Sequence, residues 1–589
     1  MTKKTVLPVI LGVLLAAGTG LLVSQQNADD AKFVKWVDTY LDEFWKFYPT
    51  AGTLAGFTKY NDKLENWDES NIEKHLDQLD KFNAELVNKI VKDKLSPELQ
   101  IDFDLIREHL DLDMFRLEKI APQQTNPLVY NDVFLNAIRG LLTKESMPID
   151  ARLAAATSRV KALSNLVKQA KENLKTSSQE YTEAAIKGFA VILDVYKNEI
   201  PKLIEAGGAE AKTKYVAEHA KAVAALEDYG KFLQSDFLPK STGNFRLGEA
   251  HQRTLQLTTG STLMINDILE RAKTDTKNIR REMFLTCMPY YKIMDPKFDL
   301  ENPPANITQE QLFNNVIPHV LNKIKVIQPT KEEFIARIKA EVADIKAFID
   351  KTKLLDVPAE MPKIDLVPAL QRDNRIAKLI TPNPYEAGSP FDIQLNPYPE
   401  TLSGDALASF LDEYTSYLLP YWTIQQVYPG SFVPAVAMMK NASLVRKLSP
   451  SLPLIMGWPV YMQDMFVYAG FNNYDLKQRL NELKLKLRIL IDFQLDVGIH
   501  EGGLTKEQAI RLMTITGFQT QAEAERNWET HVLNPGRGSM AYIGYQEILD
   551  MESDYKKAKG NNFSKKEFLQ KLLSYGAVPI RTLKTLITQ

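Results

Sequence analysis

The chain has 589 residues, and its 72 Lys and Arg against 74 Asp and Glu leave a formal charge of −2. Such a balance provides no excess of positive charge to hold a polyanion, so we expect no nucleic-acid partner. With 44% hydrophobic and 25% charged residues, the composition is typical of a folded globular protein and excludes disordered and collagen-like chains. The single cysteine, Cys287, excludes an internal disulfide and is predicted to pack in the core.

Residues 1–30 are predicted to be a targeting segment. Lys3 and Lys4 precede an apolar run from Val6 to Val23. This run is longer than the ~7–15 residues typical of a cleaved signal and reaches the lower limit of ~17–25 residues for a membrane-spanning helix. No clear Ala-x-Ala cleavage site follows the run, and no Cys stands there to take a lipid. We therefore expect an uncleaved transmembrane signal-anchor, with a cleaved signal peptide as the alternative.

The same segment predicts where the protein resides. Positive charge before an apolar span keeps the N-terminus in the cytoplasm and exports the remainder of the chain. We expect a location in the bacterial cell envelope, anchored in the inner membrane and facing the periplasm, or in the periplasm if the signal is cleaved. The membrane is then a partner through the N-terminal helix.

Beyond residue 30, hydrophobic periodicity predicts that most of the chain is helical. Apolar residues recur at steps of three and four with charged residues between them, as on one face of an amphipathic helix. The segments with this spacing are Phe33–Phe44, Leu153–Leu174, 330–352 and Leu476–Leu490. The expected fold class is mainly α, with residues 31–589 forming one helical domain.

A Pro-rich crossover at about 356–403 interrupts the helical pattern. Eight of the 30 prolines lie in this stretch and exclude a long helix there. Within it, Phe391–Leu395 alternates polar and apolar residues, which is typical of a strand. We expect little β structure beyond this segment.

The chain lacks the short motifs of several enzyme classes. Its seven histidines include no pair at the i, i+4 spacing with which a helix holds zinc, and His500-Glu501 is followed by Leu504 where that motif needs His. There is no Gly-rich nucleotide loop, no Gly-x-Ser-x-Gly elbow and no acidic calcium loop. These patterns by themselves leave the function open.

Several short segments nevertheless follow one another in an order that one protein family shares. They are Phe47–Gly56, Trp67–Ser70, Phe237–Pro239, Phe245–Gly248, Tyr428–Gly430, Gly457–Tyr461, Asp496–His500, Thr505–Ala509, Pro535-Gly536 and Gly544. Through this ordered series the chain resembles the bacterial DUF885 proteins, which are large, helical, exported proteins similar to zinc peptidases. The resemblance covers nearly the whole chain after residue 30. It implies a zincin-like body of two lobes around a deep central cleft.

The residues that hold the metal in this family are replaced here. The family pattern His-Glu-x-x-Pro-Gly-His-His, followed by Gly-Trp-Ala-x-Tyr-x-Glu, aligns with segments that begin at Gln425 and Gly457. Neutral amides neither offset the charge of a divalent cation nor act as bases near neutral pH. The resemblance therefore implies a degenerate site without metal, cofactor or catalytic residues. Its replaced positions are Gln425, Gln426, Ser431, Phe432 and Gln463, together with Ala541, where the family has a tyrosine.

Four residues near the replaced positions are candidates for ligand binding: His500, Asp496, Arg537 and Tyr542. His500 is interpreted either as a histidine that supports the former site or as a residual substrate-binding or catalytic group. Arg537 is either a surface residue or an anchor for a carboxylate, because guanidinium groups bind carboxylates at two points. Arg488, Asp492 and Asp496 are spaced one helical turn apart, which predicts a solvated ladder of ion pairs.

The expected function is that of a pseudoenzyme. Such a protein would bind a peptide in its cleft, or act as a subunit or scaffold that docks another envelope protein in a membrane-associated complex. The alternative is an active exported hydrolase that uses a relocated metal or metal-free chemistry around His500 and Asp496. A peptide or an envelope protein is thus the expected partner.

Overall fold

The computed structural model describes residues 28–143, 147–260, 264–297, 306–325, 330–368, 375–386, 388, 390–396 and 403–587. The predicted signal-anchor lies outside these residues except for 28–30, which open the first helix. None of the helices described between residues 28 and 587 is long and apolar enough to cross a membrane. This finding corrects the expectation of a membrane partner for the described part of the chain, and the run from Val6 to Val23 lies outside that part.

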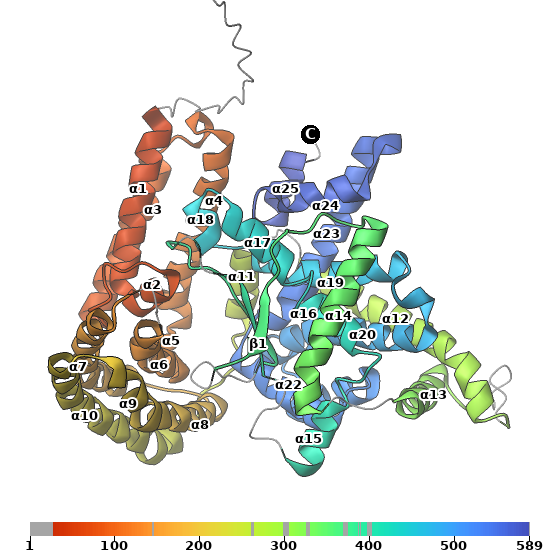
Figure 1. Ribbon diagram of the computed structural model, residues 1–589, viewed down its shortest axis with the longest axis horizontal. Helices are drawn as coiled ribbons and strands as arrows, with labels where there is room; N and C mark the ends of the chain where they lie inside the picture. Colours follow the sequence, from red (N-terminus) through yellow and green to blue (C-terminus); the bar gives the residue numbers. More distant parts are fainter. Residues whose placement is uncertain are drawn as a thin grey trace, which may run out of the picture.

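The described chain is mainly helical, which confirms the predicted fold class. Helices α1 to α10 occupy the left side of Figure 1, where the N-terminal colours are drawn. They are α1 (Ala28–Phe47), α2 (Pro49–Ala55), α3 (Glu69–Lys89), α4 (Pro97–Phe115), α5 (Pro122–Thr125), α6 (Leu128–Leu142), α7 (Ile149–Asn173), α8 (Gln179–Asp194), α9 (Ile200–Leu203) and α10 (Ala209–Lys231).

The helices that follow build the rest of the body and contain the site. Helices α16 to α25 lie to the right of the N-terminal helices in Figure 1, except for α18, which is drawn beside α4. The helices in this part are α11 (Glu249–Thr259), α12 (Ile265–Met294), α13 (Gln309–Ile324), α14 (Lys331–Thr352), α15 (Gly404–Leu411), α16 (Leu419–Gln426), α17 (Phe432–Lys440), α18 (Leu444–Leu448), α19 (Leu452–Tyr468), α20 (Leu476–His500), α21 (Lys506–Arg511), α22 (Gln521–Leu533), α23 (Arg537–Lys559), α24 (Lys565–Ser574) and α25 (Ile580–Ile587).

The helices predicted from periodicity are confirmed, because each apolar stripe is the buried face of its helix. In α7, Leu153, Val160 and Leu163 are fully or almost fully buried. The other predicted segments correspond to α1, α14 and α20. Cys287 on α12 is also fully buried, as predicted for a core residue.

The Pro-rich crossover forms a small three-stranded sheet. Its strands are β1 (Lys363–Leu366), β2 (Ala377–Ile380) and β3 (Asp392–Leu395), in the order β1-β3-β2. Strand β3 pairs in parallel with β1 and antiparallel with β2, with Ile393 opposite both Ile364 and Leu379. The strand predicted at Phe391–Leu395 is therefore confirmed as β3.

Helices α19 and α23 cross at very close range beneath the site. A Cβ atom on Gly457 would lie 2.3 Å from the main-chain carbon of Gly544 and 2.4 Å from the nitrogen of Tyr545. The neighbouring Trp458 is fully buried. Gly457 thus allows the two main chains to approach closely beside the buried Trp458 ring, and this contact holds the starts of both helices at one wall of the pocket.

Candidate functional site

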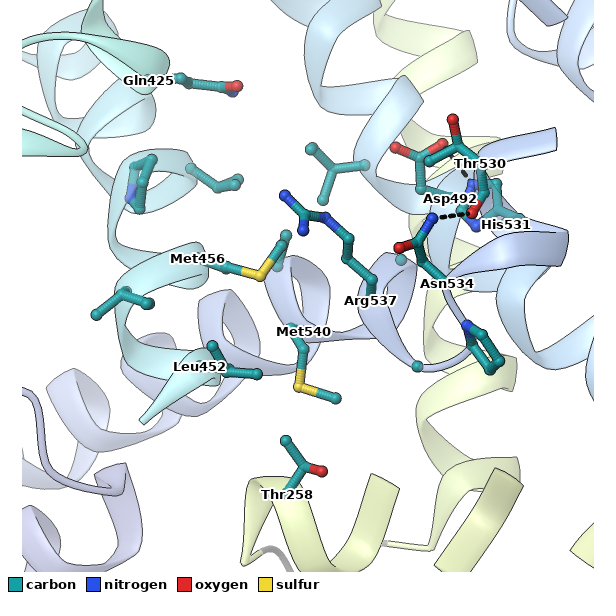
Figure 2. A pocket seen from close by; sticks show the side chains of 18 of the residues that line it. Thr258, Gln425, Leu452, Met456, Asp492, Thr530, His531, Asn534, Arg537 and Met540 are labelled. Atoms are coloured by element: carbon teal, nitrogen blue, oxygen red, sulfur yellow. Dashed lines mark hydrogen bonds and ion pairs between the residues drawn. The ribbon is translucent and has the colours of Figure 1, made fainter. Parts of the chain in front are cut away.

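A pocket of about 680 Å³ opens between α11, α16, α19, α20, α22 and α23 (Figure 2). One wall is apolar and comes mainly from α19, with Ile455, Met456 and Pro459. The facing wall is polar and includes Asn527, Thr530, His531 and Asn534 from α22 and its end. This combination of an apolar wall and converging polar groups is typical of a binding site for a small or extended ligand.

A cation and an anion lie inside this pocket. Arg537, the first residue of α23, is exposed, and its side chain extends into the middle of the pocket in Figure 2. Asp492 of α20 lies at the polar wall, 3.3 Å from the Nε2 atom of His531. Burial favours the neutral imidazole, but the hydrogen bond with Asp492 outweighs it and raises the pKa of His531.

The structure brings four of the replaced positions to the pocket surface and keeps two behind it. The residues that line the pocket are Gln425, Gln426, Ser431 and Ala541. Gln425 is held in place by a hydrogen bond from its Nε2 to Oε1 of Gln463, which is fully buried. Ser431 Oγ donates to the main-chain oxygen of Gln425 over 3.2 Å.

A buried carboxyl group completes this chain of amides. Gln463 Nε2 donates to Oε1 of Glu482 over 2.5 Å and to the main-chain oxygen of Glu482 over 3.2 Å. Glu482 is fully buried on α20 and pairs with Arg479 one turn earlier. Burial raises the pKa of the Glu482 carboxyl, although the Arg479 guanidinium opposes the shift.

These residues do not fit the zinc that the family resemblance implies. The amide nitrogen of Gln425 points at the oxygen of Gln463, so the side chains at two replaced ligand positions bind each other. No group of three or more His, Cys, Asp or Glu residues in the described part of the chain is arranged to hold a metal ion. Neutral amides are poor ligands for zinc.

Phe432 occupies the last position of the replaced ligand segment and belongs to the core. It is fully buried, and its ring centroid lies 5.4 Å from that of Phe391 and 5.9 Å from that of Tyr428. At Gly430, between Tyr428 and Phe432 in the sequence, an added Cβ atom would lie 2.4 Å from the main-chain oxygens of Ile424 and Gln425. The loop between α16 and α17 therefore turns back tightly, and only glycine fits at its end.

Asp496 binds the N-terminus of α23 and does not face the pocket. Its carboxylate accepts hydrogen bonds from the main-chain nitrogens of Gly536 at 2.9 Å and Ser539 at 3.2 Å, and from Oγ of Ser539. Burial opposes the charge, yet the hydrogen bonds with His251 and Ser539 lower the pKa of Asp496. Asp496 thereby satisfies the first amides of α23 and positions Arg537.

His500 and His251 stack behind the same wall, with ring centroids 5.0 Å apart. His251 Nδ1 lies 2.7 Å from Oε1 of Glu501, and its Nε2 lies 3.4 Å from Asp496. Burial favours the neutral form of His251, but these two carboxylates outweigh it and raise its pKa to about 9. For His500, burial lowers the pKa to about 4, and its Nε2 lies 2.9 Å from the main-chain oxygen of His531.

Tyr542 points away from the pocket. Its hydroxyl donates to Asp275 on α12 over 2.8 Å, and its side chain lines a separate cavity of about 210 Å³. Ala541, one residue earlier, takes the place at the pocket wall. Of the four candidate ligand-binding residues, the structure thus brings Arg537 alone to the pocket, while His500, Asp496 and Tyr542 lie behind its walls.

The predicted ion-pair ladder on α20 is wrong. Arg488 NH2 lies 2.7 Å from the fully buried Glu413, and its NH1 lies 3.5 Å from Glu523. Asp492 pairs with His531, and Asp496 is fully buried at the start of α23. Each member therefore finds its partner outside α20, because this face of α20 is covered by α22, the start of α23 and the segment between α15 and α16 rather than by water.

Sequence reasoning missed Glu482 and His251, which support the site from behind. A signal for Glu482 exists, because it shares a helical stripe with the apolar residues Leu485, Ile489 and Phe493. A charged residue in an apolar stripe indicates a buried, partnered group. His251 carries no comparable signal, since both of its carboxylate partners come from the distant helix α20 and the residue that follows it.

Comparison with known proteins identifies the family. The sequence profile described as "Bacterial protein of unknown function (DUF885)" matches residues 49–587. The chain belongs to the DUF885 family. No curated protein matches the sequence.

Two solved structures share the fold. One is described as a candidate lipoprotein of unknown function from Shewanella oneidensis, with 23% identity and a TM-score of 0.81, and the match covers 95% of this chain and 100% of the other. The second is described as a candidate lipoprotein from Colwellia psychrerythraea, with 14% identity and a TM-score of 0.76, covering 95% of this chain and 99% of the other. At these identities the likeness establishes the fold of this DUF885 protein and nothing further.

Proposed function

We propose that this DUF885 protein is a pseudoenzyme that binds a peptide segment in its central pocket without cleaving it. One observation carries the proposal. The side chains at two replaced metal-ligand positions, Gln425 and Gln463, bind each other, while the adjoining pocket of about 680 Å³ contains Arg537. The zincin-like arrangement of two lobes around this pocket is part of the same proposal.

The lining of the pocket supports a peptide as the ligand. Amide and hydroxyl side chains such as Gln426, Asn527 and Thr530 can pair with the main-chain groups of an extended peptide. Met456 and Ile455 offer apolar surface to its side chains. Such a lining binds peptides without the desolvation cost of burying many charges.

A hydrolase built on His500 and Asp496 is less well supported. The two side chains are at most 1% exposed, and Asp496 is already engaged by Gly536 and Ser539 at the start of α23. A general base must come within hydrogen-bond reach of the substrate, either directly or through one water. Neither side chain lines the pocket.

We also propose a location in the bacterial cell envelope. The support comes from the two similar structures, both of which are described as candidate lipoproteins. The peptide would then belong to a protein of the same compartment. Fractionation of cells that express the full chain would test the location separately from binding.

The binding proposal is tested with the full chain and a library of labelled peptides. Fluorescence anisotropy should detect binding that persists in the presence of a chelator, and mass spectrometry should find the peptides uncut. Met456→Trp should block the pocket and weaken binding at least tenfold. Leu285→Trp, at a residue that is 54% exposed on α12, is the matched control and should bind as the wild type does. Cleavage that a chelator abolishes would overturn the proposal.

A further inference from the structure

The buried amide chain determines which atom Gln425 offers to the pocket. Gln463 Nε2 donates to the main-chain oxygen of Glu482, which can only accept, and to the Glu482 side chain. This orientation turns Gln463 Oε1 toward Gln425, so Gln425 must donate a hydrogen bond to it from Nε2. Among the described residues none donates to the remaining Oε1 of Gln425. The side chain of Gln425 therefore presents a hydrogen-bond acceptor to the pocket, and Figure 2 shows it pointing inward.

Arg537 provides the complementary charge. In Figure 2 its guanidinium lies between Gln425 on one side and Asp492 with His531 on the other. A ligand carboxylate would be repelled by Asp492 and attracted by the guanidinium, so it is favoured on the Gln425 side of Arg537. Arg537 would hold a carboxylate bound there. The acceptor oxygen of Gln425 would then lie within reach of the rest of the ligand.

The apolar wall lies on that same side. Met456 of α19 is drawn next to the tip of Arg537 in Figure 2, and Leu452 and Met540 follow below it. Met540 is almost fully buried, whereas Leu452 is 41% exposed at the mouth. These side chains offer a surface for one apolar side chain beside the cation.

The C-terminal residue of a peptide carries the three matching groups on a single Cα atom. Its carboxylate suits Arg537, its N–H suits the acceptor of Gln425, and its side chain suits the wall at Met456. An internal segment lacks the carboxylate, and an N-terminal amine would be repelled by Arg537. Resting on the proposed peptide-binding function, we infer that the pocket recognises the free C-terminus of a peptide whose last side chain is apolar.

The inference is tested with three labelled peptides that differ at one end alone. The first ends in Leu with a free carboxylate, the second ends in Leu with a carboxamide, and the third ends in Gly with a free carboxylate. With the full chain, anisotropy should show the first binding about tenfold or more tightly than the second, as expected for loss of one charged hydrogen-bonded pair. The third should also bind more weakly than the first, because it lacks the apolar side chain.

Two variants assign the effects to residues. Arg537→Ala should remove the difference between acid and amide while leaving amide binding in place. Met456→Ala should reduce the preference for Leu over Gly and keep the preference for acid over amide. Arg271→Ala is the control for Arg537, since Arg271 lies in the neighbouring cavity and pairs at the surface with Asp550. It should change none of the three affinities.

The outcomes separate this inference from the function on which it rests. Equal binding of acid and amide would overturn recognition of the C-terminus and leave peptide binding intact. An unchanged acid preference in Arg537→Ala would likewise overturn it. Failure of every peptide to bind, in the library as well as in this set, would overturn both proposals.

Discussion

Gln425 donates a hydrogen bond from its side-chain nitrogen to the side-chain oxygen of Gln463. These residues lie on α16 and α19, at the two positions where the family resemblance implies a histidine and a glutamate. The contact joins α16 and α19 by one bond between neutral groups. In the pseudoenzyme that we propose, this contact keeps the two walls together without a metal.

Restoring the ligand pattern should destabilise the protein rather than recruit zinc. Phe432→His places a polar ring where the Phe432 ring contacts those of Phe391 and Tyr428, and we expect a loss of about 2–4 kcal/mol in the free energy of unfolding. Ser431→His, at a partly exposed position in the pocket, should cost less than about 1 kcal/mol. Urea unfolding measures both.

The complete replacement extends this prediction to metal content. A variant with His at 425, 431 and 432 and Glu at 426 and 463 should contain far less than one zinc per chain by elemental analysis. The reason is that Glu482, Arg479 and the packing around Phe432 are arranged for amides and an aromatic ring, and not for imidazoles. Stoichiometric zinc in the restored variant would contradict this account.

Gly457→Ala should disrupt the crossing of α19 and α23. The added methyl group would lie 2.3 Å from the main chain of Gly544, which cannot move away as a flexible side chain could. We expect a loss of about 1–3 kcal/mol in stability, measured by urea unfolding. Gly498→Ala is the matched control, since its nearest contact is the Leu504 side chain at 3.4 Å and alanine favours a helix. The control should be neutral or slightly stabilising.

His251 should make stability fall at alkaline pH. Its folded pKa of about 9 lies above the ordinary value of 6.5, so its contribution is complete below about pH 6.5 and is lost as the pH rises through 9. The loss is on the order of 3 kcal/mol for a shift of this size. Between pH 6 and 10, the free energy of unfolding should change less with pH for His251→Gln than for the wild type. Identical slopes would show that the histidine is not charged in the folded protein.

Glu482 should produce a loss of stability in a more acidic window. Because burial raises the pKa of this carboxyl to about 7, its contribution is complete below about pH 4.5 and is lost as the pH rises through 7. Glu482→Gln keeps the acceptor for Gln463 and removes the buried charge. The difference in unfolding free energy between variant and wild type should shift in favour of the variant by about 1–3 kcal/mol from pH 5 to 8. A constant difference over this range would contradict the raised pKa.

Several features of the fold were predictable from local patterns. The spacing of Leu153, Val160 and Leu163 predicted α7, because a helix places such residues on one face whatever covers it. The prolines of the crossover excluded a helix, and the alternation around Ile393 predicted β3. The ordered motifs also identified the family.

The support of the site was decided by the tertiary structure. The sequence places Arg488, Asp492 and Asp496 one turn apart, and in water they would pair with one another. In the folded protein, that face is covered by other segments. Arg488 pairs with Glu413, Asp492 pairs with His531, and Asp496 binds the start of α23. Periodicity reports which face of a helix is buried, but not which distant residue covers it. The same reason hid Glu482: only folding brings α16, α19 and α20 together, so that a buried carboxyl can set the orientation of Gln463 and Gln425 and thereby the atom that the pocket offers to a ligand.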